Sequence, residues 1–358
     1  MSKITEFQKV LKKKKIDFFI ACNIDYVGID YDMLYFSGFE GIGALVVPKN
    51  KKCFLIVPRD GIVKARKSGI KFYVLPKKKK LFEFIAENVS KNKIKHKRMG
   101  INKEGVNLLV KDYLKKCFKK SKLIDLRKEL YKTREIKTKT EIKIIREGCR
   151  ISDNILKKCF KEFKRFKREA EVMAFLEYES KKRGCGLAFP TIVASGNSSS
   201  EVHHTTEDVK LKKGFCIIDF GIRYKNYCTD TTRTIYLGKP TKKEIIMYDL
   251  LLKVQKNAIK NVKKNGKCSK LNENVKKGLD KYSKNFIHGL GHGIGVKIHE
   301  LPNLTERSKD IFQEGQVFTI EPGVYFNNFG IRIEDDVLVS KNNVEVLTKI
   351  GKSLLIID

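Results

Sequence analysis

The sequence predicts two consecutive domains: an α/β domain over residues 1–130, followed by an α+β domain over residues 131–358. The chain has 358 residues, which is more than twice a typical domain length. Its first third alternates short apolar segments with amphipathic ones, as strands and helices joined by short connections do. From about residue 137, long amphipathic helices are followed by strand-rich and glycine-rich segments. This change of pattern indicates the boundary between the domains.

The elements of the front domain follow from apolar runs and from the turn residues that separate them. Pro48, Lys49 and Asn50 form one predicted turn, and Pro58 begins another. The predicted strands are 16–22, 34–39, 43–48, 53–58, 71–76, 98–102 and 121–126. The predicted helices are 7–15, 62–69, 81–91 and 106–118.

The second domain is reached through the charged, helical segment 126–160, which predicts a linker helix. Its further helices are predicted at 167–183, 241–264 and 269–283. The predicted strands are 189–196, 214–224, 226–238, 315–326 and 330–340.

The chain is strongly basic, with 76 Lys and Arg, 41 Asp and Glu, and a formal net charge of +35. Its basic runs, at 12–15, 77–80 and 91–98, lie far apart and are rich in lysine. Specific phosphate recognition favours arginine and aromatic side chains gathered in one region. We therefore predict a lysine-rich solvated surface and no specific nucleic-acid partner.

Cysteine usage and hydropathy predict a cytoplasmic protein. The nine cysteines are scattered singly and form no CxxC pair, which suits a reducing compartment. No apolar run reaches the length of about 18 residues that a membrane span needs. The N-terminal segment MSKITEFQKVLKKKK also lacks the apolar core of a secretory signal.

Two aspartates are the first candidate site residues. Asp219 ends the apolar run FCIID, and Asp230 follows on what reads as the second strand of a hairpin turning at 223–226. In such a hairpin the two carboxylates lie opposite or diagonal on one face. Two buried carboxylates this close repel each other unless a cation lies between them.

The segment FIHGLGHGIGVKIHELP, at 286–302, concentrates three of the six histidines: His288, His292 and His299. The interspersed glycines allow close approach of the backbone. A single histidine here would more often be a core residue, but three beside glycines predict a functional site.

Glu321 in FTIEPGVY and Glu334 in GIRIEDD each lie in an apolar strand context. Arg332 shares the strand face of Glu334, where it can orient a carboxylate. Together with Asp219 and Asp230, these segments supply four carboxylates and at least one imidazole. Four carboxylates balance two divalent cations, and oxygen-rich ligation with imidazole suits Mn, Co, Zn or Fe. Two such ions can activate a water for hydrolysis.

The segments IIDFGIRYKNYCTDTTRT, GLGHGIGVKIHELP, VFTIEPGVY and GIRIED resemble the creatinase, prolidase and methionine aminopeptidase superfamily over roughly residues 135–358. LYFSGFEGIGALVV also resembles the creatinase-type N-terminal domain. The resemblance implies a pita-bread metallopeptidase domain with two divalent metal ions, Mn²⁺ or Co²⁺ first, and Zn²⁺ or Fe²⁺ as alternatives. The implied metal ligands are Asp219, Asp230, His292, Glu321 and Glu334.

The resemblance also implies which side chains contact substrate. His203, in NSSSEVHH, matches a histidine that stabilises the oxyanion, with its neighbour His204 left open as the alternative. His299 matches a second substrate histidine, Arg332 is placed with the catalytic residues, and Glu321 doubles as metal ligand and proton carrier. We further expect His288 to support the site from behind and Cys228 to be a packed small residue.

An α/β front domain and the arginine of GIRIED resemble the proline-specific branch: Xaa-Pro aminopeptidase or Xaa-Pro dipeptidase. The branch implies small peptide substrates with proline second, and a homodimer. One alternative is a methionine-type or other aminopeptidase on the same fold. Another is a non-catalytic scaffold that binds nucleic acid or protein, prompted by the net charge of +35.

Overall fold

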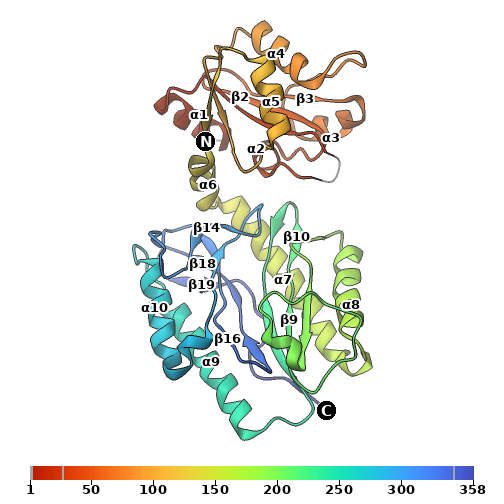
Figure 1. The fold of residues 1–358 in the computed structure, drawn as a ribbon, viewed down its shortest axis with the longest axis vertical. Helices are drawn as coiled ribbons and strands as arrows, with labels where there is room; N and C mark the ends of the chain where they lie inside the picture. Colours follow the sequence, from red (N-terminus) through yellow and green to blue (C-terminus); the bar gives the residue numbers. More distant parts are fainter. Residues whose placement is uncertain (1–2, 26–27, 342) are drawn as a thin grey trace. The chain divides into compact units, whose positions relative to one another are not determined.

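The computed structural model describes residues 3–25, 28–341 and 343–358. The chain forms two compact units, Met1–Thr133 and Arg134–Asp358, each with its own hydrophobic core (Figure 1). Among the described residues, no helix is both long and apolar enough to cross a membrane.

The first unit is built on a six-stranded sheet in the order β4–β3–β2–β1–β5–β6. Its pairs β1–β2 and β2–β3 are antiparallel, and its other neighbouring pairs are parallel. The strands are β1 (Phe18–Asn23), β2 (Gly43–Pro48), β3 (Phe54–Val57), β4 (Phe72–Val74), β5 (Arg98–Ile101) and β6 (Lys122–Asp125). The helices are α1 (Lys3–Lys13), α2 (Tyr31–Ser37), α3 (Ile62–Lys67), α4 (Leu81–Lys91), α5 (Leu108–Cys117) and α6 (Arg127–Glu135).

The strand predicted at 34–39 is wrong, because helix α2 occupies most of it. Asp30 caps the helix by accepting hydrogen bonds from the backbone N–H groups of Asp32 and Met33, at 3.0 and 2.8 Å. Gly38, with φ of 66°, ends it and donates its N–H to the carbonyl of Leu34. The apolar run resembled a strand, but the capping residues on both sides fix a short helix.

Four long helices frame the second unit: α7 (Lys139–Lys161), α8 (Glu169–Lys182), α9 (Lys242–Lys260) and α10 (Cys268–Leu279). Thr138 and Thr241 begin α7 and α9 with capping boxes, in which the carboxylates of Glu141 and Glu244 accept the backbone N–H of the capping threonine. In Figure 1, α8 lies on one side of this unit and α9 and α10 on the other, with β9 and β16 between them.

The strands of the second unit form several small sheets. One has the order β20–β12–β9–β8 and another the order β14–β13–β15–β18–β19, with β11–β10–β7 and β16–β17 beside them. The bounds are β7 (Gly186–Leu187), β8 (Ile192–Ser195), β9 (Gly214–Asp219), β10 (Ile222–Tyr224), β11 (Tyr227–Cys228), β12 (Thr232–Leu237), β13 (His292–Gly293), β14 (Glu300–Asn303), β15 (Val317–Ile320), β16 (Gly323–Tyr325), β17 (Gly330–Arg332), β18 (Asp335–Val339), β19 (Val344–Val346) and β20 (Ile356–Ile357).

Two apolar clusters hold the sheets to the helices. One packs Leu156 and Phe175, from α7 and α8, with Ile218 of β9. The other packs Leu251 of α9 with Phe318 of β15. Burying side chains of this size contributes roughly 1.5–3 kcal/mol each. The ends of β9, β12, β13, β15 and β17 therefore sit on a rigid frame, and the candidate site lies at these ends.

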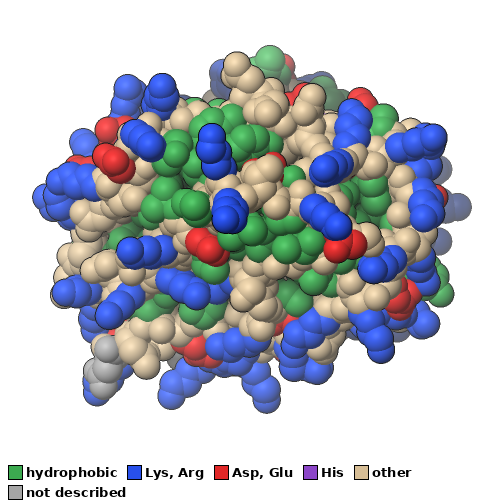
Figure 2. Space-filling view, turned by 90° about the horizontal axis from the view of Figure 1, so that it is seen from below, with side chains coloured by type: hydrophobic (Ala, Val, Ile, Leu, Met, Phe, Trp, Pro, Cys, Tyr) green, Lys and Arg blue, Asp and Glu red, His purple; other side chains and the backbone are tan. Residues whose placement is uncertain are grey.

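Basic side chains are spread over the molecular face shown in Figure 2, between apolar and uncharged polar surface. Acidic side chains on this face are few and isolated. This distribution matches the lysine-rich solvated surface that the sequence predicts.

Candidate metal centre

The strand register brings Asp219 and Asp230 together. β9 and β12 pair antiparallel, with Asp219 opposite Thr232, so Asp230, two residues before Thr232, lies diagonal to Asp219. The intervening β10–β11 hairpin turns at Lys225 and Asn226, which both have positive φ, 46° and 73°. The hairpin and the diagonal arrangement that the sequence predicts are confirmed.

Glu321 and Glu334 follow the ends of β15 and β17, and neither is an edge-strand surface residue. Glu334 is 1% exposed. Its N–H donates to the carbonyl of Thr232 at 3.1 Å, and its Oε2 accepts from the Thr232 hydroxyl at 2.7 Å. Glu321 Oε1 accepts from the hydroxyl of Thr319 at 3.0 Å. Thr232 therefore orients the carboxylate of Glu334, and Thr319 orients the carboxylate of Glu321.

His292 begins β13, where the backbone passes close to β14. A Cβ placed on Gly293 would overlap the carbonyl group of Leu301, so the sequence requires glycine here. His292 Nε2 lies 3.6 Å from Asp230 Oδ2 and 3.4 Å from Glu321 Oε1. The glycine-rich segment thus delivers one imidazole to the carboxylates.

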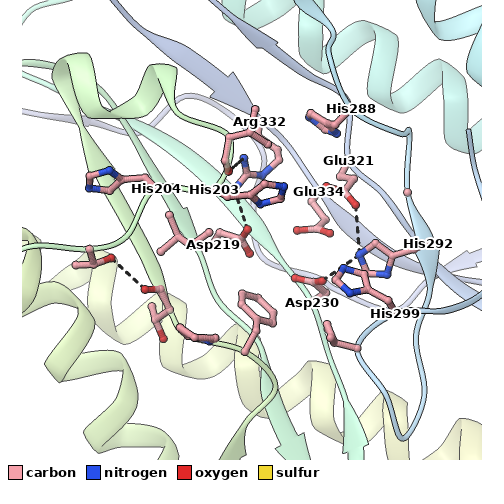
Figure 3. A pocket seen from close by; sticks show the side chains of 18 of the residues that line it. His203, His204, Asp219, Asp230, His288, His292, His299, Glu321, Arg332 and Glu334 are labelled. Atoms are coloured by element: carbon pink, nitrogen blue, oxygen red, sulfur yellow. Dashed lines mark hydrogen bonds and ion pairs between the residues drawn. The ribbon is translucent and has the colours of Figure 1, made fainter. Parts of the chain in front are cut away.

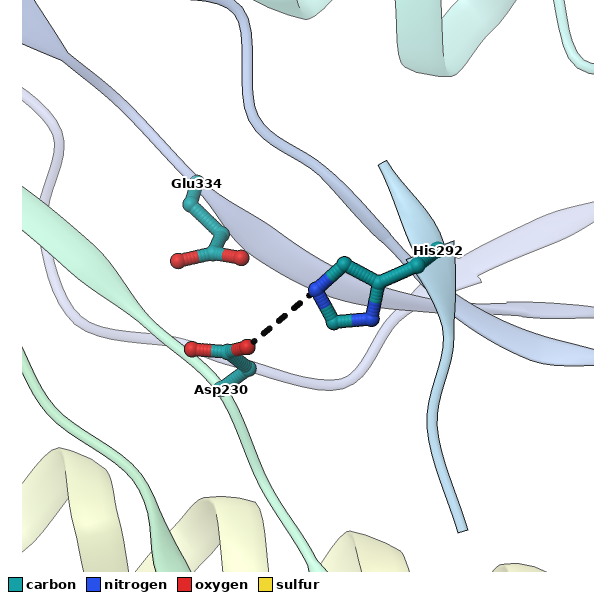
Figure 4. Close-up of side chains that lie close together, drawn as sticks. All are labelled: Asp230, His292 and Glu334. Carbon is teal, nitrogen blue, oxygen red and sulfur yellow. Dashed lines mark ion pairs between the residues drawn. The ribbon is translucent and has the colours of Figure 1, made fainter. Parts of the chain in front are cut away.

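These side chains line one cavity of about 540 Å³ (Figure 3). Asp230, His292 and Glu334 each offer one ligand atom, and these atoms lie within 4.8 Å of one another (Figure 4). Asp219 and Glu321 line the same cavity, so all five side chains that the sequence singled out as ligands face one space.

The electrostatics of this cluster are unfavourable without a cation. Burial, reinforced by the neighbouring carboxylates, raises the pKa of Asp230 and of Glu334 well above the ordinary range. Burial also raises the pKa of Glu321 and lowers the pKa of His292. Asp219 Oδ1 is buried, and among the described residues no donor reaches it. An anionic oxygen in this position, among oxygen and imidazole donors, fits a divalent metal ion.

Arg332 orients Asp219, whereas the sequence placed it on one strand face with Glu334; β17 ends at Arg332, so Glu334 lies beyond the strand. Arg332 Nη2 donates to Asp219 Oδ2 at 2.7 Å, and its Nη1 donates to the hydroxyl of Tyr325 at 2.7 Å. The same hydroxyl lies 3.1 Å from His288 Nε2. The sequence did not predict a role for Tyr325, although its position in TIEPGVY, beside Glu321, was available as a signal.

A second layer of buried polar groups supports the ligands and was also not predicted. Asp336 Oδ2 accepts the backbone N–H of Asp230 at 3.0 Å. The fully buried Arg233 donates to Asp335 Oδ1 at 2.7 Å and also to the carbonyl of Glu334. These contacts join β12 to β18 directly beneath the cluster, and pairing of this kind is invisible in a sequence.

The two histidines of VHH point in different directions (Figure 3). His203 is exposed, lies near Arg332 and Asp219, and has no hydrogen-bond partner in the described parts of the chain. His204 is buried, and its Nε2 and Nδ1 each lie 3.1 Å from a carboxylate oxygen, of Glu169 and Glu201 respectively. His204 borders the cavity, but its ring is committed to these carboxylates, whereas His203 is available to a substrate.

The remaining candidates also have defined places. The ring of His299 lies 4.3 Å from that of His292, centroid to centroid, and burial with the charge of His292 lowers the pKa of His299 to about 4. His299 is therefore neutral at neutral pH. Cys228 is buried outside the cavity lining, and burial raises the pKa of its thiol to about 12, as expected for a packing residue.

Part of the cavity lining is apolar and was not located from the sequence. We call this part the apolar wall; it consists of Phe189, Pro190, Ile192, Val202 and Ile298. The residues come from three separate segments, so no local spacing reveals them. A wall of this kind can hold an apolar substrate group against the polar cluster.

The chain matches two protein families: Metallopeptidase family M24 over residues 143–341, and the Creatinase/Prolidase N-terminal domain over residues 3–136. It is 35% identical over 353 residues to an Xaa-Pro dipeptidase of Pyrococcus furiosus, covering 96% of this chain and 99% of the relative.

Solved structures agree with these matches. The X-Pro aminopeptidase from Thermotoga maritima superposes with a TM-score of 0.88 at 31% identity, over 96% of this chain and 98% of that one. The prolidase from Pyrococcus horikoshii also gives a TM-score of 0.88, at 29% identity and over 99% of each chain. The predicted fold, a creatinase-type domain followed by a pita-bread domain, is confirmed. The chain therefore belongs to metallopeptidase family M24, with a front domain of the creatinase/prolidase N-terminal type.

Proposed function

We propose that this chain is a dinuclear metallopeptidase that hydrolyses the Xaa-Pro bond of dipeptides or of short peptides with proline second. The convergence of five side chains on one cavity carries the proposal: Asp219, Asp230, His292, Glu321 and Glu334. The similarity to an Xaa-Pro dipeptidase and to an X-Pro aminopeptidase supports the substrate class, and favours it over a methionine-type aminopeptidase or a non-catalytic scaffold.

Those five residues would hold two divalent ions, Mn²⁺ or Co²⁺, with Zn²⁺ or Fe²⁺ as alternatives. Four carboxylates and two divalent ions would together be neutral, which would offset the carboxylate repulsion that adds to burial in raising the pKa of Asp230 and Glu334. When bound, such ions supply Lewis-acid polarisation and lower the pKa of water toward neutrality. The donor set, oxygen-rich with one imidazole, favours these ions over copper.

The other side chains handle the substrate. Glu321 takes a proton from the attacking water and passes it to the leaving imino nitrogen. His203 donates a hydrogen bond to the carbonyl oxygen as negative charge develops on it. His299, neutral at neutral pH, contacts the substrate from the opposite side, and Arg332 holds Asp219 in place. Each role uses a group that faces the cavity.

Proline at the second position makes the scissile bond a tertiary amide without an N–H, so its recognition depends on shape and apolar contact. The apolar wall of Phe189, Pro190, Ile192, Val202 and Ile298 supports this substrate class. A rigid pyrrolidine ring matches a rigid apolar surface better than a solvated polar side chain does.

Product analysis on metal-defined protein tests the proposal. Chelated protein, resupplied with Mn²⁺ or Co²⁺, should cleave Ala-Pro or Ala-Pro-Ala, and should leave Ala-Ala and Met-Ala nearly untouched. The ratio of the two proline substrates separates dipeptidase from aminopeptidase activity. No turnover of either proline substrate by metal-loaded protein would contradict the proposal, and tight salt-sensitive RNA binding in its place would favour a scaffold.

The homodimer and the cytoplasmic location stay predictions, as does the absence of a specific nucleic-acid partner. Gel filtration with light scattering tests the first of these. For the homodimer we expect a mass twice the 41.3 kDa of the single chain. A single-chain mass at micromolar concentration would contradict it.

A further inference from the structure

We propose that His204 is a positioning residue for the reaction: held by the buried carboxylate of Glu169, it fixes the segment that presents His203 to the cavity. The inference rests on the proposed function, because it assumes that His203 acts on the substrate carbonyl. The segment concerned, 201–206, lies between the 3₁₀ helix Gly196–Ser200 and β9.

Glu169 is an anchor inside the fold. It is the first residue of α8 and is fully buried. Its Oε1 accepts hydrogen bonds from both the N–H and the hydroxyl of Ser195, each at 2.7 Å. Its Oε2 is 3.1 Å from His204 Nε2. One carboxylate therefore joins α8, β8 and the segment 201–206, and a buried carboxylate fixes its partners strongly because each lost contact leaves charge unpaired.

The contacts of the segment are arranged on both sides of His203. Before it, Arg332 Nη1 donates to the carbonyl of Val202 at 3.2 Å. Beyond it, the Thr206 hydroxyl donates to the carbonyl of Thr191 at 3.0 Å and accepts the N–H of Val193 at 2.7 Å. His203 makes no hydrogen bond of its own within the described residues, so its direction depends on these neighbours.

His204 is the fixed side chain adjacent to His203, and Figure 3 shows the two rings pointing apart. As the Glu169 contact holds the His204 ring on one side of the backbone, the His203 ring is held toward the cavity. A hydrogen bond to a developing oxyanion depends on placement within a fraction of an ångström. Freedom at His204 should therefore weaken transition-state binding more than substrate binding.

The first test is substitution of His204. His204→Ala should lower kcat for Ala-Pro about 10- to 100-fold, change KM less than about threefold, and leave the metal content as in wild type. His204→Gln should recover much of the loss, because the Gln amide can still donate to Glu169. The pattern of low kcat, near-normal KM and rescue by Gln would not arise from general loosening of the fold. Equal losses in the Ala and Gln variants at unchanged Tm would contradict the proposal.

A double-mutant cycle shows whether His204 acts through His203. His203→Ala alone should lower kcat roughly 10- to 1000-fold. In that background, His204→Ala should lower kcat by no more than about twofold further, since the group that it positions is already gone. Multiplicative losses would show that His204 acts independently and would overturn the proposal. An unchanged kcat in His203→Ala alone would instead refute the role given to His203 under the proposed function.

Glu201→Gln is the matched control, because Glu201 is the solvent-exposed partner of the same ring, 67% exposed. An exposed pair contributes little, so kcat should stay within about twofold of wild type. A loss as large as that of His204→Ala would contradict the assignment of the anchoring role to the buried Glu169.

Discussion

Asp230 and Glu334 lie where an ionised carboxylate is unfavourable unless a cation is bound beside it. Both are buried, 5% and 1% exposed, and each is surrounded by further carboxylates. The fold nevertheless holds both side chains in place. Asp336 accepts the backbone N–H of Asp230, and the hydroxyl of Thr232 donates to the carboxylate of Glu334. Keeping unfavourable charges in one fixed arrangement is typical of metal sites, where the cation supplies the missing attraction.

Asp230→Asn and Glu334→Gln should each abolish bound metal and peptidase activity together. Both changes keep the shape of the side chain but remove one of four balancing charges and a predicted ligand atom. Metal content by mass spectrometry and Ala-Pro hydrolysis are the two readouts. The control Glu345→Gln changes a half-buried, ion-paired carboxylate outside the cavity and should retain both. Full metal stoichiometry in the Asp230 or Glu334 variant would refute its role as a ligand.

Among the secondary-structure elements, the site depends on strand ends whose positions are fixed by the helices that pack against the sheets. α7 and α8 pack on β9, and Lys158 of α7 and Arg183 both contact Glu179 of α8. The hydrogen bonds from Lys158 and Arg183 lower the pKa of Glu179 to about 2. The ion pair between Lys158 and Glu179 therefore joins α7 to α8 in addition to their apolar packing.

Glu179→Gln should lower the free energy of unfolding at pH 7 by roughly 1–2 kcal/mol. Because the folded pKa lies below the unfolded value of about 4.3, this contribution is complete at neutral pH and is lost as the pH falls from about 5 toward 2. Urea unfolding of both proteins at several pH values measures it. A difference between the two proteins that grows on acidification would contradict a stabilising role for the ionised Glu179 carboxylate.

Gly293→Ala should distort β13 and with it the position of His292. The added Cβ overlaps the carbonyl group of Leu301, and overpacking of this kind costs about 1–3 kcal/mol. We expect a lower Tm and weaker metal binding. Gly351→Ala, where no atom lies within 4 Å of the added Cβ, is the control and should change neither. Unchanged metal affinity in the Gly293 variant would show that the close approach does not position His292.

At the scale of the whole molecule, five residues spread from 219 to 334 meet in a single cavity. Their residue types and order could be predicted because each lies in a short segment with its own motif, as in GHGIG and TIEP. The structure of residues 34–39 was predicted wrongly, because an apolar run is compatible with a strand and also with a capped helix. The apolar wall and the His204–Glu169 contact were missed because they depend on pairings between distant segments. Tyr325 was missed although its contact with Arg332 spans only seven residues, because a sequence does not show which side-chain contacts form across a hairpin. On the face shown in Figure 2 the basic side chains are dispersed, whereas the carboxylates of the site gather in one cavity.

Metal binding should stabilise the entire second unit, because the ligands come from both of its halves. At 100-fold excess over Kd, a single bound ion contributes about 2.7 kcal/mol, or a rise in Tm of about 5–10 °C. Thermal scans of chelated protein with and without Mn²⁺ measure this shift. Asp230→Asn should show almost none. An equal shift in that variant would mean that the stabilising ion binds elsewhere.

If the cavity holds two catalytic divalent ions, stepwise titration of metal-free protein will count them. Mn²⁺ or Co²⁺ is added stepwise while bound metal per chain and Ala-Pro hydrolysis are followed on the same samples. We expect saturation at two ions per chain, with activity appearing as the sites fill and disappearing on chelation. Hydrolysis that persists without metal, or a protein that binds no ion at this cavity, would contradict this expectation.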